Sequence, residues 1–263
     1  MSGYWCYETS RILAVTGAIG VFLFCTAGHS IDNAVQQPNE QPRCAVLLHG
    51  LARTHRSMRP VGDYLRENGW QVVNQGYPSR SKPVEELSKM VGVGFARCVQ
   101  QGVPAHKIDF VTHSMGGLLL RKWVQDTQTE FGRAVMLGPP NNGSELVDRI
   151  GATIVFRAYN GPAGSQLGTG ANAVWRSLPP VPFELGVIAG VGEERGFLGR
   201  HVAAPNDGKV SVASTRVAGM SDHLEVQAGH TFMMNNPEIH RQIGHFLLQG
   251  SFADTAATVP EAN

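Results

Sequence analysis

From Cys44 onward, short apolar runs alternate with segments whose apolar residues recur every three or four positions. Such runs predict buried strands, and the three-to-four spacing predicts helices with one buried face. The strands predicted in this way are residues 44–48, 71–75, 108–112, 133–137, 185–189 and 223–226. The predicted helices are residues 57–68, 83–98, 116–126 and 236–248. Because strands and helices alternate, the sequence predicts an α/β fold with a mostly parallel, twisted sheet and helices on both faces.

One connection is much longer than the others. Residues 138–182 are rich in Gly, Pro and Asn, and they separate two predicted strands. A connection of this length usually has a function, so we expect a short cap insertion over a binding site. Trp175, Leu178 and Phe183, in or beside the cap, are candidates to contact a substrate, and simple packing under a long loop is the alternative.

The N-terminal part of the chain differs from the rest. Arg11 precedes an apolar run at residues 12–24, and small residues follow the run. The run is short for a membrane span and typical of a signal peptide, with Ala27 as a plausible cleavage point. Residues 1–30 are therefore predicted to be a signal peptide, or a membrane anchor if the span extends to Ala27. Either segment predicts a protein that is exported to the periplasm, secreted or anchored in a membrane.

The remaining residues divide into three parts. Residues 31–43 are polar, contain Pro and are predicted to be a linker. Residues 44–250 hold all the predicted strands and helices, which is a suitable length for one large domain. Residues 251–263 are predicted to be a flexible tail.

Composition narrows the function without identifying it. Of the 263 residues, 42% are hydrophobic and 16% are charged, which suits a globular domain with a sizeable core. Lys and Arg total 22 and Asp and Glu total 21, so no charge excess indicates a nucleic-acid partner. This balance favours a neutral or lipid-like substrate over a polyanion. The sequence has no HExxH or paired-Cys metal motif and no complete nucleotide-binding motif, so we expect no cofactor.

The strongest chemical signal is the segment VTHSMGG at residues 111–117. An apolar strand, a serine between small residues and then a helical pattern predict a nucleophile elbow, with Ser114 as the nucleophile. The serine would lie at a helix N-terminus, where the helix dipole favours developing negative charge. Gly116 meets the need for a small residue two positions after the serine, whereas Thr112 stands where Gly is usual. The alternative is an ordinary strand–turn–helix capped by the serine.

A second signal, the segment LHGL at residues 48–51, ends the first predicted strand. Acyl transfer forms an oxyanion, and each backbone N–H aimed at it contributes roughly 10²–10³-fold in rate. We expect one donor from Met115, directly after the nucleophile. The other is expected from Leu51, because Gly50 lets the backbone turn inward. The side chain of His49 is interpreted as a packed histidine that holds the turn.

The acid and the base are expected later in the chain, because both follow the nucleophile when it stands on such an elbow. Asp207 lies among turn residues after the fifth predicted strand, and His230 follows the last one. We therefore expect Asp207 to orient His230, the general base, although Asp207 also fits a simple turn residue. Asp222 is a rival for the acid. The adjacent His223 would be the base of that rival pair, but two neighbouring residues cannot easily face each other.

Six segments together carry a resemblance to a known group: HGLAR, THSMGG, GPPNNGSE, GPAGSQLG, NDGKVSV and GHTFMM. In this order, from about Cys44 to Phe252, they resemble a bacterial α/β-hydrolase of the esterase/lipase group. The resemblance implies the α/β-hydrolase fold, with Ser114 as nucleophile, Asp207 as acid and His230 as base. It also implies hydrolysis of carboxylic esters without a cofactor, with the acyl chain bound under a variable cap.

The reaction implied by this resemblance passes through an acyl-enzyme on the serine. The expected partner is a small acyl ester, lipid esters included, and the N-terminal segment would allow membrane association. An acyltransferase or a thioesterase would use the same triad. A non-catalytic binding or scaffold protein is a further alternative, weakened because a scaffold requires neither the triad nor the oxyanion loops.

The resemblance also bears on the cysteines. Of four, Cys6 and Cys25 fall in the predicted export segment, which leaves Cys44 and Cys98. In the implied fold, the strand that begins at Cys44 lies between the next two strands, and the helix that links those two crosses over it. The last turn of this helix carries Cys98 and should lie over the start of the strand. If the protein is exported, we expect a disulfide at the amino edge of the sheet, with two buried thiols as the alternative.

Overall fold

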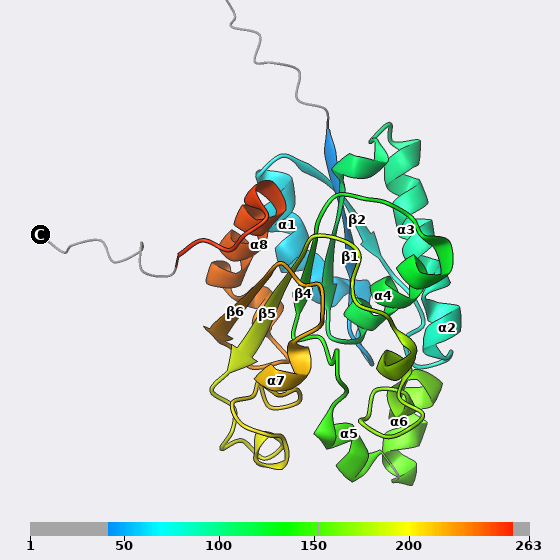
Figure 1. Ribbon diagram of the computed structural model, residues 1–263, viewed down its shortest axis with the longest axis vertical. Coiled ribbons are helices and arrows are strands. Elements are labelled where there is room, and N and C mark those ends of the chain that lie inside the picture. Colours follow the sequence, from blue (N-terminus) through cyan, green and yellow to red (C-terminus); the bar gives the residue numbers. More distant parts are fainter. Residues whose placement is uncertain (1–41, 152, 255–263) are drawn as a thin grey trace, which may run out of the picture. The chain divides into compact units, whose positions relative to one another are not determined.

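The computed structural model describes residues 42–151 and 153–254. The predicted signal peptide or anchor, most of the predicted linker and most of the predicted tail lie outside the described residues. Within them, six strands form one sheet in the order β2-β1-β3-β4-β5-β6, and every pairing is parallel (Figure 1). The strands are β1 Arg43–Leu48, β2 Trp70–Gln75, β3 Ile108–His113, β4 Ala134–Leu137, β5 Leu185–Val191 and β6 Asp222–Gln227.

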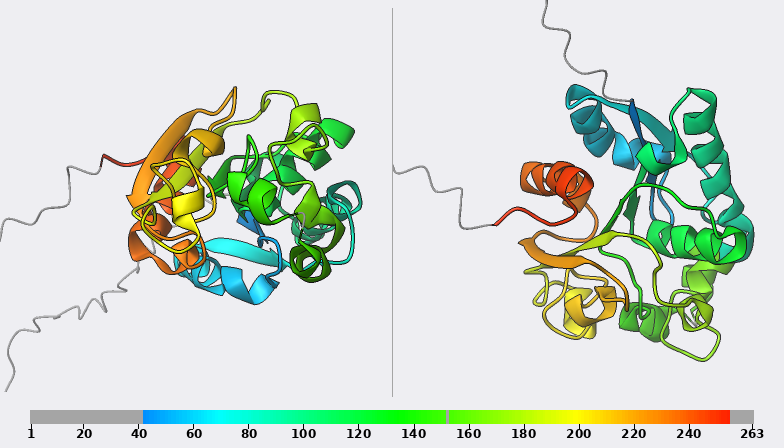
Figure 2. Two further views of the ribbon diagram at one scale, coloured as in Figure 1. Left: turned by 90° about the horizontal axis from the view of Figure 1, so that it is seen from below. Right: turned by 45° about the horizontal axis from the view of Figure 1, so that its top comes forward.

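Helices connect the strands and cover both faces of the sheet. They are α1 Arg59–Glu67, α2 Val84–Leu87, α3 Lys89–Gln100, α4 Met115–Thr127, α5 Glu145–Ile150, α6 Ile154–Ser165, α7 Val212–Thr215 and α8 Pro237–Gln249. Short 3-10 turns occur at His55–Met58, Ala105–Lys107, Val174–Ser177, Gly199–His201 and Met233–Asn235. Figures 1 and 2 show α3 and α4 against one face and α1 and α8 against the other. The predicted α/β fold with helices on both faces of a parallel sheet is confirmed.

Each face of the sheet buries its own apolar layer. Successive side chains of a strand point to opposite faces, and β1 follows this rule. Val46 and Leu48 belong to the layer beneath α3 and α4, whereas Ala45 and Leu47 belong to the layer beneath α1 and α8. A strand buried on both faces has a continuous apolar sequence, which is why the pattern located β1 to within one residue.

The folded domain extends further at both ends than the sequence predicted. The sequence predicts a linker through residue 43, but Arg43 begins β1, and its guanidinium forms a bidentate ion pair with the buried carboxylate of Asp109. At the other end, Phe252 of the predicted tail packs against Phe246 of α8, with ring centroids 5.0 Å apart. An ion pair and an aromatic contact therefore hold residues that polar composition assigned to linker and tail.

Two predicted helices are each divided in the structure. The helix predicted at 57–68 begins as a 3-10 turn and continues as α1. The helix predicted at 83–98 is interrupted at Ser88, between α2 and α3. The hydroxyl of Ser88 donates to the carbonyl of Glu85 at 2.9 Å, a local bond that competes with those of a regular helix.

The cap insertion at 138–182 contains helices that the sequence pattern did not predict. Figure 1 places α5 and α6 together beyond the carboxyl ends of the strands. Thr153 caps the N-terminus of α6, where its hydroxyl accepts the N–H of Phe156 at 3.2 Å. Gly161, at φ 64°, and Pro162 kink the helix near its middle.

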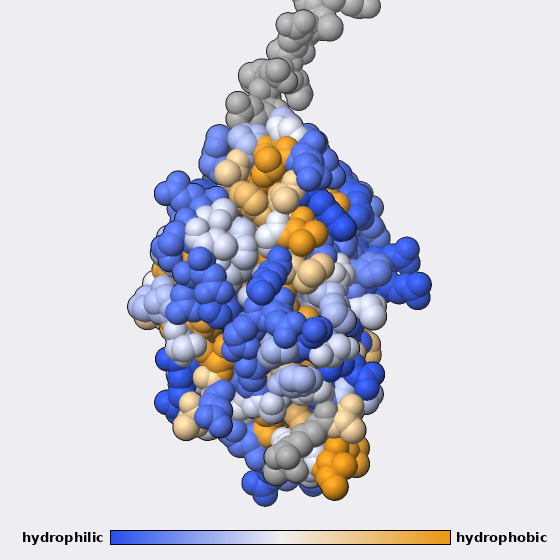
Figure 3. Space-filling view, turned by 90° about the vertical axis from the view of Figure 1, so that its right-hand side faces the viewer, coloured by the Kyte–Doolittle hydropathy of each residue, from blue (hydrophilic) through white to orange (hydrophobic). Residues whose placement is uncertain are grey.

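The first turn of α6 presents apolar side chains to solvent. Ile154 is 85% exposed and Val155 is 79% exposed. Figure 3 shows hydrophobic surface at the cap end of the molecule, below a mainly hydrophilic middle. No helix in residues 42–151 or 153–254 is long and apolar enough to cross a membrane.

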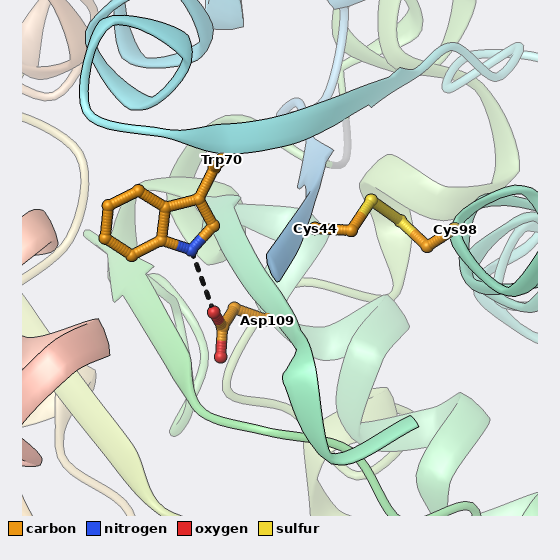
Figure 4. Close-up of a disulfide and its surroundings, with 4 residues drawn as sticks. All are labelled: Cys44, Trp70, Cys98 and Asp109. Atoms are coloured by element: carbon orange, nitrogen blue, oxygen red, sulfur yellow. Dashed lines mark hydrogen bonds between the residues drawn. A yellow bond between two sulfur atoms is a disulfide. The ribbon is translucent and has the colours of Figure 1, made fainter. Parts of the chain in front are cut away.

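Cys44 and Cys98 form a disulfide, as the sequence predicted from the implied topology. Cys44 lies in β1, which is paired on either side with β2 and β3, and Cys98 lies near the end of α3. Both cysteines are fully buried. Figure 4 shows the bridge near Trp70 and Asp109, where the indole N–H donates to the carboxylate at 3.0 Å. The bridge therefore belongs to the amino edge of the sheet, opposite the loops that follow the strands.

Removal of this bridge is expected to lower stability without changing the site at the opposite edge. A disulfide that closes a loop across a separation of 54 residues restricts the unfolded chain by about 4 kcal/mol in the loop-entropy account. We therefore expect the double variant Cys44→Ala/Cys98→Ala to lose about 2–4 kcal/mol of unfolding free energy in urea titrations. Reduced wild type should match the variant. Equal midpoints for the variant and oxidised wild type would contradict the prediction.

Candidate active site

Ser114 occupies a sharp turn between β3 and α4. Its backbone lies at φ 53° and ψ −123°, a conformation that costs a non-glycine residue about 1–3 kcal/mol. Its N–H donates to the carbonyl of Leu137 at 2.8 Å, which ties the turn to the neighbouring strand. A Cβ on Gly116 would lie 2.8 Å from the carbonyl oxygen of Leu48, so only glycine fits there. The backbone has the geometry predicted for a nucleophile elbow.

Thr112, the departure from the usual elbow pattern, lies in the core beside Gly117. The threonine side chain is fully buried. A Cβ on Gly117 would lie 3.4 Å from its hydroxyl oxygen and 2.9 Å from the sulfur of Met136. A side chain at position 117 would therefore crowd Met136, whereas its distance from Thr112 is that of an ordinary van der Waals contact.

Asp207 lies in the loop between β5 and β6, and Asn206 holds this loop in shape. The side chain of Asn206 is fully buried, and its amide donates to the carbonyls of Gly199 and Val202, both at 3.1 Å. Its amide oxygen accepts the N–H of Gly208 at 2.9 Å. A buried side chain with all these bonds fixes the backbone on either side of Asp207.

The three residues predicted for catalysis form one hydrogen-bonded chain. His230 Nδ1 lies 2.7 Å from Asp207 Oδ2, and His230 Nε2 lies 3.0 Å from Ser114 Oγ. The other carboxylate oxygen, Oδ1, accepts the N–H groups of Lys209 and Val210 at 3.0 and 2.8 Å. Because Oδ1 is held by the backbone, Oδ2 is directed at the ring. In this arrangement Nδ1 carries the proton, and Nε2 is free to accept the proton of the serine.

His113 supports the imidazole of His230 from the side of the sheet. Its Nε2 lies 2.9 Å from the carbonyl oxygen of His230, and the ring centroids are 4.8 Å apart. Burial lowers the pKa of His113 well below its usual value, and the nearby His230 lowers it further, so His113 is neutral. Gly50 makes room for this ring, because a Cβ there would lie 2.8 Å from His113 Nδ1.

Of the two predicted oxyanion donors, Met115 follows Ser114 in the chain, and Leu51 lines the cavity at the serine. Met115 is the first residue of α4, so its N–H has no acceptor within the helix. Leu51 lines the same cavity as the serine, and its N–H donates to no group in the described part of the chain. The turn itself comes from Ala52, at φ 54°, rather than from Gly50 as the sequence suggested.

His49 holds this early loop by packing, as the sequence analysis interpreted it. The side chain is fully buried and stacks on Tyr77, with ring centroids 4.0 Å apart. The hydroxyl of Tyr77 donates to the carbonyl of His49. The histidine therefore connects the loop after β1 to the loop after β2.

A cavity of about 390 Å³ opens beside Ser114 and His230. Apolar side chains of the cap form much of its wall: Leu146, Val147, Ile150, Phe156, Tyr159 and Leu167. A second cavity of about 560 Å³ adjoins the first, and Leu198, Lys209, His230 and Thr231 line both. An apolar wall around a few polar groups is typical of a small-molecule site.

The three side chains that the sequence suggested as substrate contacts lie away from the cavity at Ser114. Trp175 donates its indole N–H to the carbonyl of Gly168 at 3.0 Å, and Leu178 is buried in the core. Phe183 packs against Phe131, with ring centroids 4.9 Å apart. None of the three lines the cavity at Ser114. The alternative, packing under a long loop, is what these side chains do, and the helical spacing of Phe156 and Tyr159 was the signal that was missed.

The rival acid, Asp222, is not at the site. It begins β6, and its two carboxylate oxygens accept the N–H groups of His223 and Phe252 at 2.7 and 2.8 Å. His223 Nε2 lies 2.9 Å from the hydroxyl of Thr215. Among residues 42–151 and 153–254, no group of three or more His, Cys, Asp or Glu could hold a metal ion.

Comparison with known proteins identifies the fold. No family model and no curated protein matches the sequence. Mature lipase BlEst2 from Bacillus licheniformis is 18% identical, with a TM-score of 0.59 over 82% of this chain and 94% of that chain. The lin2722 product of Listeria innocua is 17% identical, with a TM-score of 0.54 over 81% and 96%. The metagenomic carboxyl esterase MGS0156 is 16% identical, with a TM-score of 0.54 over 73% and 65%. At these identities the likeness is one of fold, and the α/β-hydrolase fold implied by the sequence is confirmed.

Proposed function

Because the chain has the α/β-hydrolase fold, we propose that it is a serine hydrolase that cleaves carboxylic esters with an apolar acyl group. The observation that carries the proposal is the chain of hydrogen bonds from Asp207 through His230 to Ser114, at the wall of an apolar cavity. A hydroxyl bonded to an oriented imidazole is an activated nucleophile. The similarity to proteins named as a lipase and a carboxyl esterase supports the same class.

The reaction begins with acylation of the serine. As Ser114 Oγ attacks the ester carbonyl, its proton passes to His230 Nε2, 3.0 Å away. The carbonyl oxygen becomes an oxyanion, which the N–H groups of Leu51 and Met115 would stabilise. The imidazolium is stabilised by Asp207 and then gives its proton to the departing alcohol.

Deacylation repeats the sequence with water as the nucleophile. His230 takes a proton from water as the water oxygen attacks the acyl-serine. The second oxyanion then collapses to release the acid, and the imidazolium returns its proton to Ser114 Oγ. The apolar wall of the cap would hold the acyl chain during both steps. Hydrophobic burial contributes about 0.8 kcal/mol for each methylene group that leaves water.

The test is hydrolysis of nitrophenyl esters with acyl chains from acetyl to palmitoyl, together with labelling by a fluorophosphonate. We expect kcat/KM to rise with chain length until the cavity is filled and to fall beyond that length. Mass spectrometry of a digest should find one phosphonylated peptide, modified at Ser114. Folded protein that hydrolyses no ester in the series and takes up no label would refute the proposal. A label on another serine would refute the assignment of the nucleophile.

A further inference from the structure

The wall of the cavity at Ser114 contains two cationic side chains, Arg53 and Lys209. Arg53 belongs to the loop after β1 that also contains Leu51, and Lys209 follows the proposed acid Asp207 by two residues. No Asp or Glu lines this cavity. The two cations lie close enough that Arg53 disfavours the charged form of Lys209.

Neither cation has an ion-pair partner in the part of the chain that the structure describes. One nitrogen of Arg53 donates to the carbonyl of Thr231 at 2.6 Å, and the guanidinium lies 5.8 Å from the ring centroid of Phe232. These contacts fix the position of the guanidinium and leave its charge unneutralised. The ammonium of Lys209 has no hydrogen-bond acceptor in residues 42–151 or 153–254.

A cation held in this way costs free energy when no ligand is bound. Burial lowers the pKa of Lys209, the nearby Arg53 lowers it further, and Asp207 opposes both effects. Asp207 attracts the ammonium without bonding to it, because its oxygens accept hydrogen bonds from two backbone N–H groups and from His230. An anion at this place would offset the cost, because opposite charges attract more strongly at a partly buried site than in bulk water.

The position of Lys209 indicates which part of an ester would carry the anion. His230 gives its proton to the departing alcohol, so the alcohol part must lie beside the imidazole. Lys209, Leu198 and Thr231 line both cavities together with His230, so they stand where the alcohol part would leave the serine. The acyl chain would extend the other way, along the apolar wall formed by α5 and α6.

Two carboxylates limit where the anion can lie. Glu193 and Asp207 line the second cavity and not the first, and the side chain of Glu193 lies against Gly208 and Gly229. An anion deep in the second cavity would meet these like charges. The favourable place is therefore the boundary near Lys209, on the side of Arg53.

We propose that the substrate is an ester whose alcohol part carries an anionic group, a carboxylate or a phosphate, held between Arg53 and Lys209. This inference rests on the proposed ester hydrolysis and specifies its substrate class. It also differs from the neutral substrate that the balanced composition favoured. The net charge of +1 belongs to the whole chain. The cavity wall has its own excess of two cations over carboxylates.

The experiment compares esters that differ only in charge. Hexanoyl esters of 3-hydroxybenzoate, 3-hydroxyphenyl phosphate, 3-hydroxybenzamide and 3-hydroxybenzamidine have the same acyl group and similar shapes. We expect kcat/KM for the two anionic esters to exceed that of the neutral benzamide ester about tenfold or more, which corresponds to about 1.4 kcal/mol. The cationic ester should be the poorest substrate. The preference should fall with added salt, because screening weakens an electrostatic contact.

Variants assign the preference to the cations. Lys209→Gln and Arg53→Gln are expected to lower the ratio of kcat/KM between the benzoate and benzamide esters several-fold, and Lys209→Arg should restore most of it. Lys89→Gln, which removes an exposed lysine of α3 outside both cavities, is the matched control and should keep the wild-type ratio. The ratio is independent of how much active protein a preparation contains, so partial misfolding of a variant does not change it.

A binding measurement separates this inference from the proposed function. Calorimetry with 3-(hexyloxy)benzoate and 3-(hexyloxy)benzamide, ethers that cannot be hydrolysed, should show tighter binding of the anion and loss of the difference in Lys209→Gln. Anion-selective binding without turnover of any ester would refute ester hydrolysis and retain the anion site. Ester turnover with a ratio of one or below would refute the anion site alone. Stronger inhibition by hexanoate than by 3-hydroxybenzoate would also refute it, because the cations would then hold the acid product.

Discussion

Ser114→Ala is expected to lower kcat/KM by at least about 10⁴-fold for every ester that the wild type hydrolyses. Alanine has no hydroxyl to attack the carbonyl, so no acyl-enzyme can form. The loss should be in kcat, because the apolar wall and the cations that bind substrate are retained. Steady-state kinetics with nitrophenyl esters, at enzyme concentrations high enough to detect the residual rate, measure the effect.

The matched control is Ser165→Ala, which removes an exposed hydroxyl of α6 that lies outside the cavity. Its kcat/KM should stay within about twofold of wild type, as for surface substitutions with no special role. Ser114→Gly adds a second readout. Glycine adopts φ 53° without cost, so this variant should be equally inactive and about 1 kcal/mol more stable. Turnover that survives in either Ser114 variant would contradict the assignment of the nucleophile.

Asp207→Asn is expected to lower kcat by about 10⁴-fold while leaving the loop intact. The amide oxygen of asparagine can still accept the N–H groups of Lys209 and Val210, which Oδ1 accepts in the wild type. The amide NH2 then faces His230 Nδ1 and donates to it. The ring is forced into the tautomer with its proton on Nε2, which cannot take the proton of Ser114. Kinetics combined with a urea titration separate this effect from unfolding.

Asp222→Asn serves as the control for the acid. Asp222 holds two backbone N–H groups at the start of β6 and does not line the cavity. Its loss should change kcat/KM by less than about threefold, an effect well under 1 kcal/mol. A larger loss of kcat in Asp222→Asn than in Asp207→Asn would mean that the acid has been assigned to the wrong carboxylate.

Sequence patterns were most informative where one physical cause dominates. The four central strands β1, β3, β4 and β5 are buried on both faces, so apolar runs located them. The edge strands β2 and β6 are partly exposed, and their sequences mix apolar and polar residues. The serine elbow was visible because its strained turn demands small neighbours. Gly116 satisfies this demand, since a Cβ there would lie 2.8 Å from the carbonyl oxygen of Leu48. The expected chain order, with the acid and the base after the nucleophile, was enough to select Asp207 and His230. The fold joins both to Ser114 in one chain of hydrogen bonds.

The residues that line the cavity could not be predicted from the sequence in the same way. The cap was recognised as an insertion, but its glycines and prolines concealed the helical spacing of Phe156 and Tyr159 in α6. Large aromatic residues such as Trp175 were poor guides, because they pack wherever a loop needs filling. Arg53 and Lys209 are far apart in the chain, and only the fold shows that both face one cavity. A whole-chain charge count cannot detect such a local pair.

The disulfide also determines how the protein would respond to proteolysis. The bridge closes a loop from Cys44 to Cys98, and the cap at 138–182 lies outside that loop. A protease that cuts inside the loop leaves both fragments covalently joined. A cut in the cap separates the fragment with Ser114 from the fragment with His230, and only non-covalent contacts such as those between β4 and β5 then hold them together. We therefore expect the working lifetime of the protein in a protease-rich medium to depend on the cap, whose first helical turn is exposed.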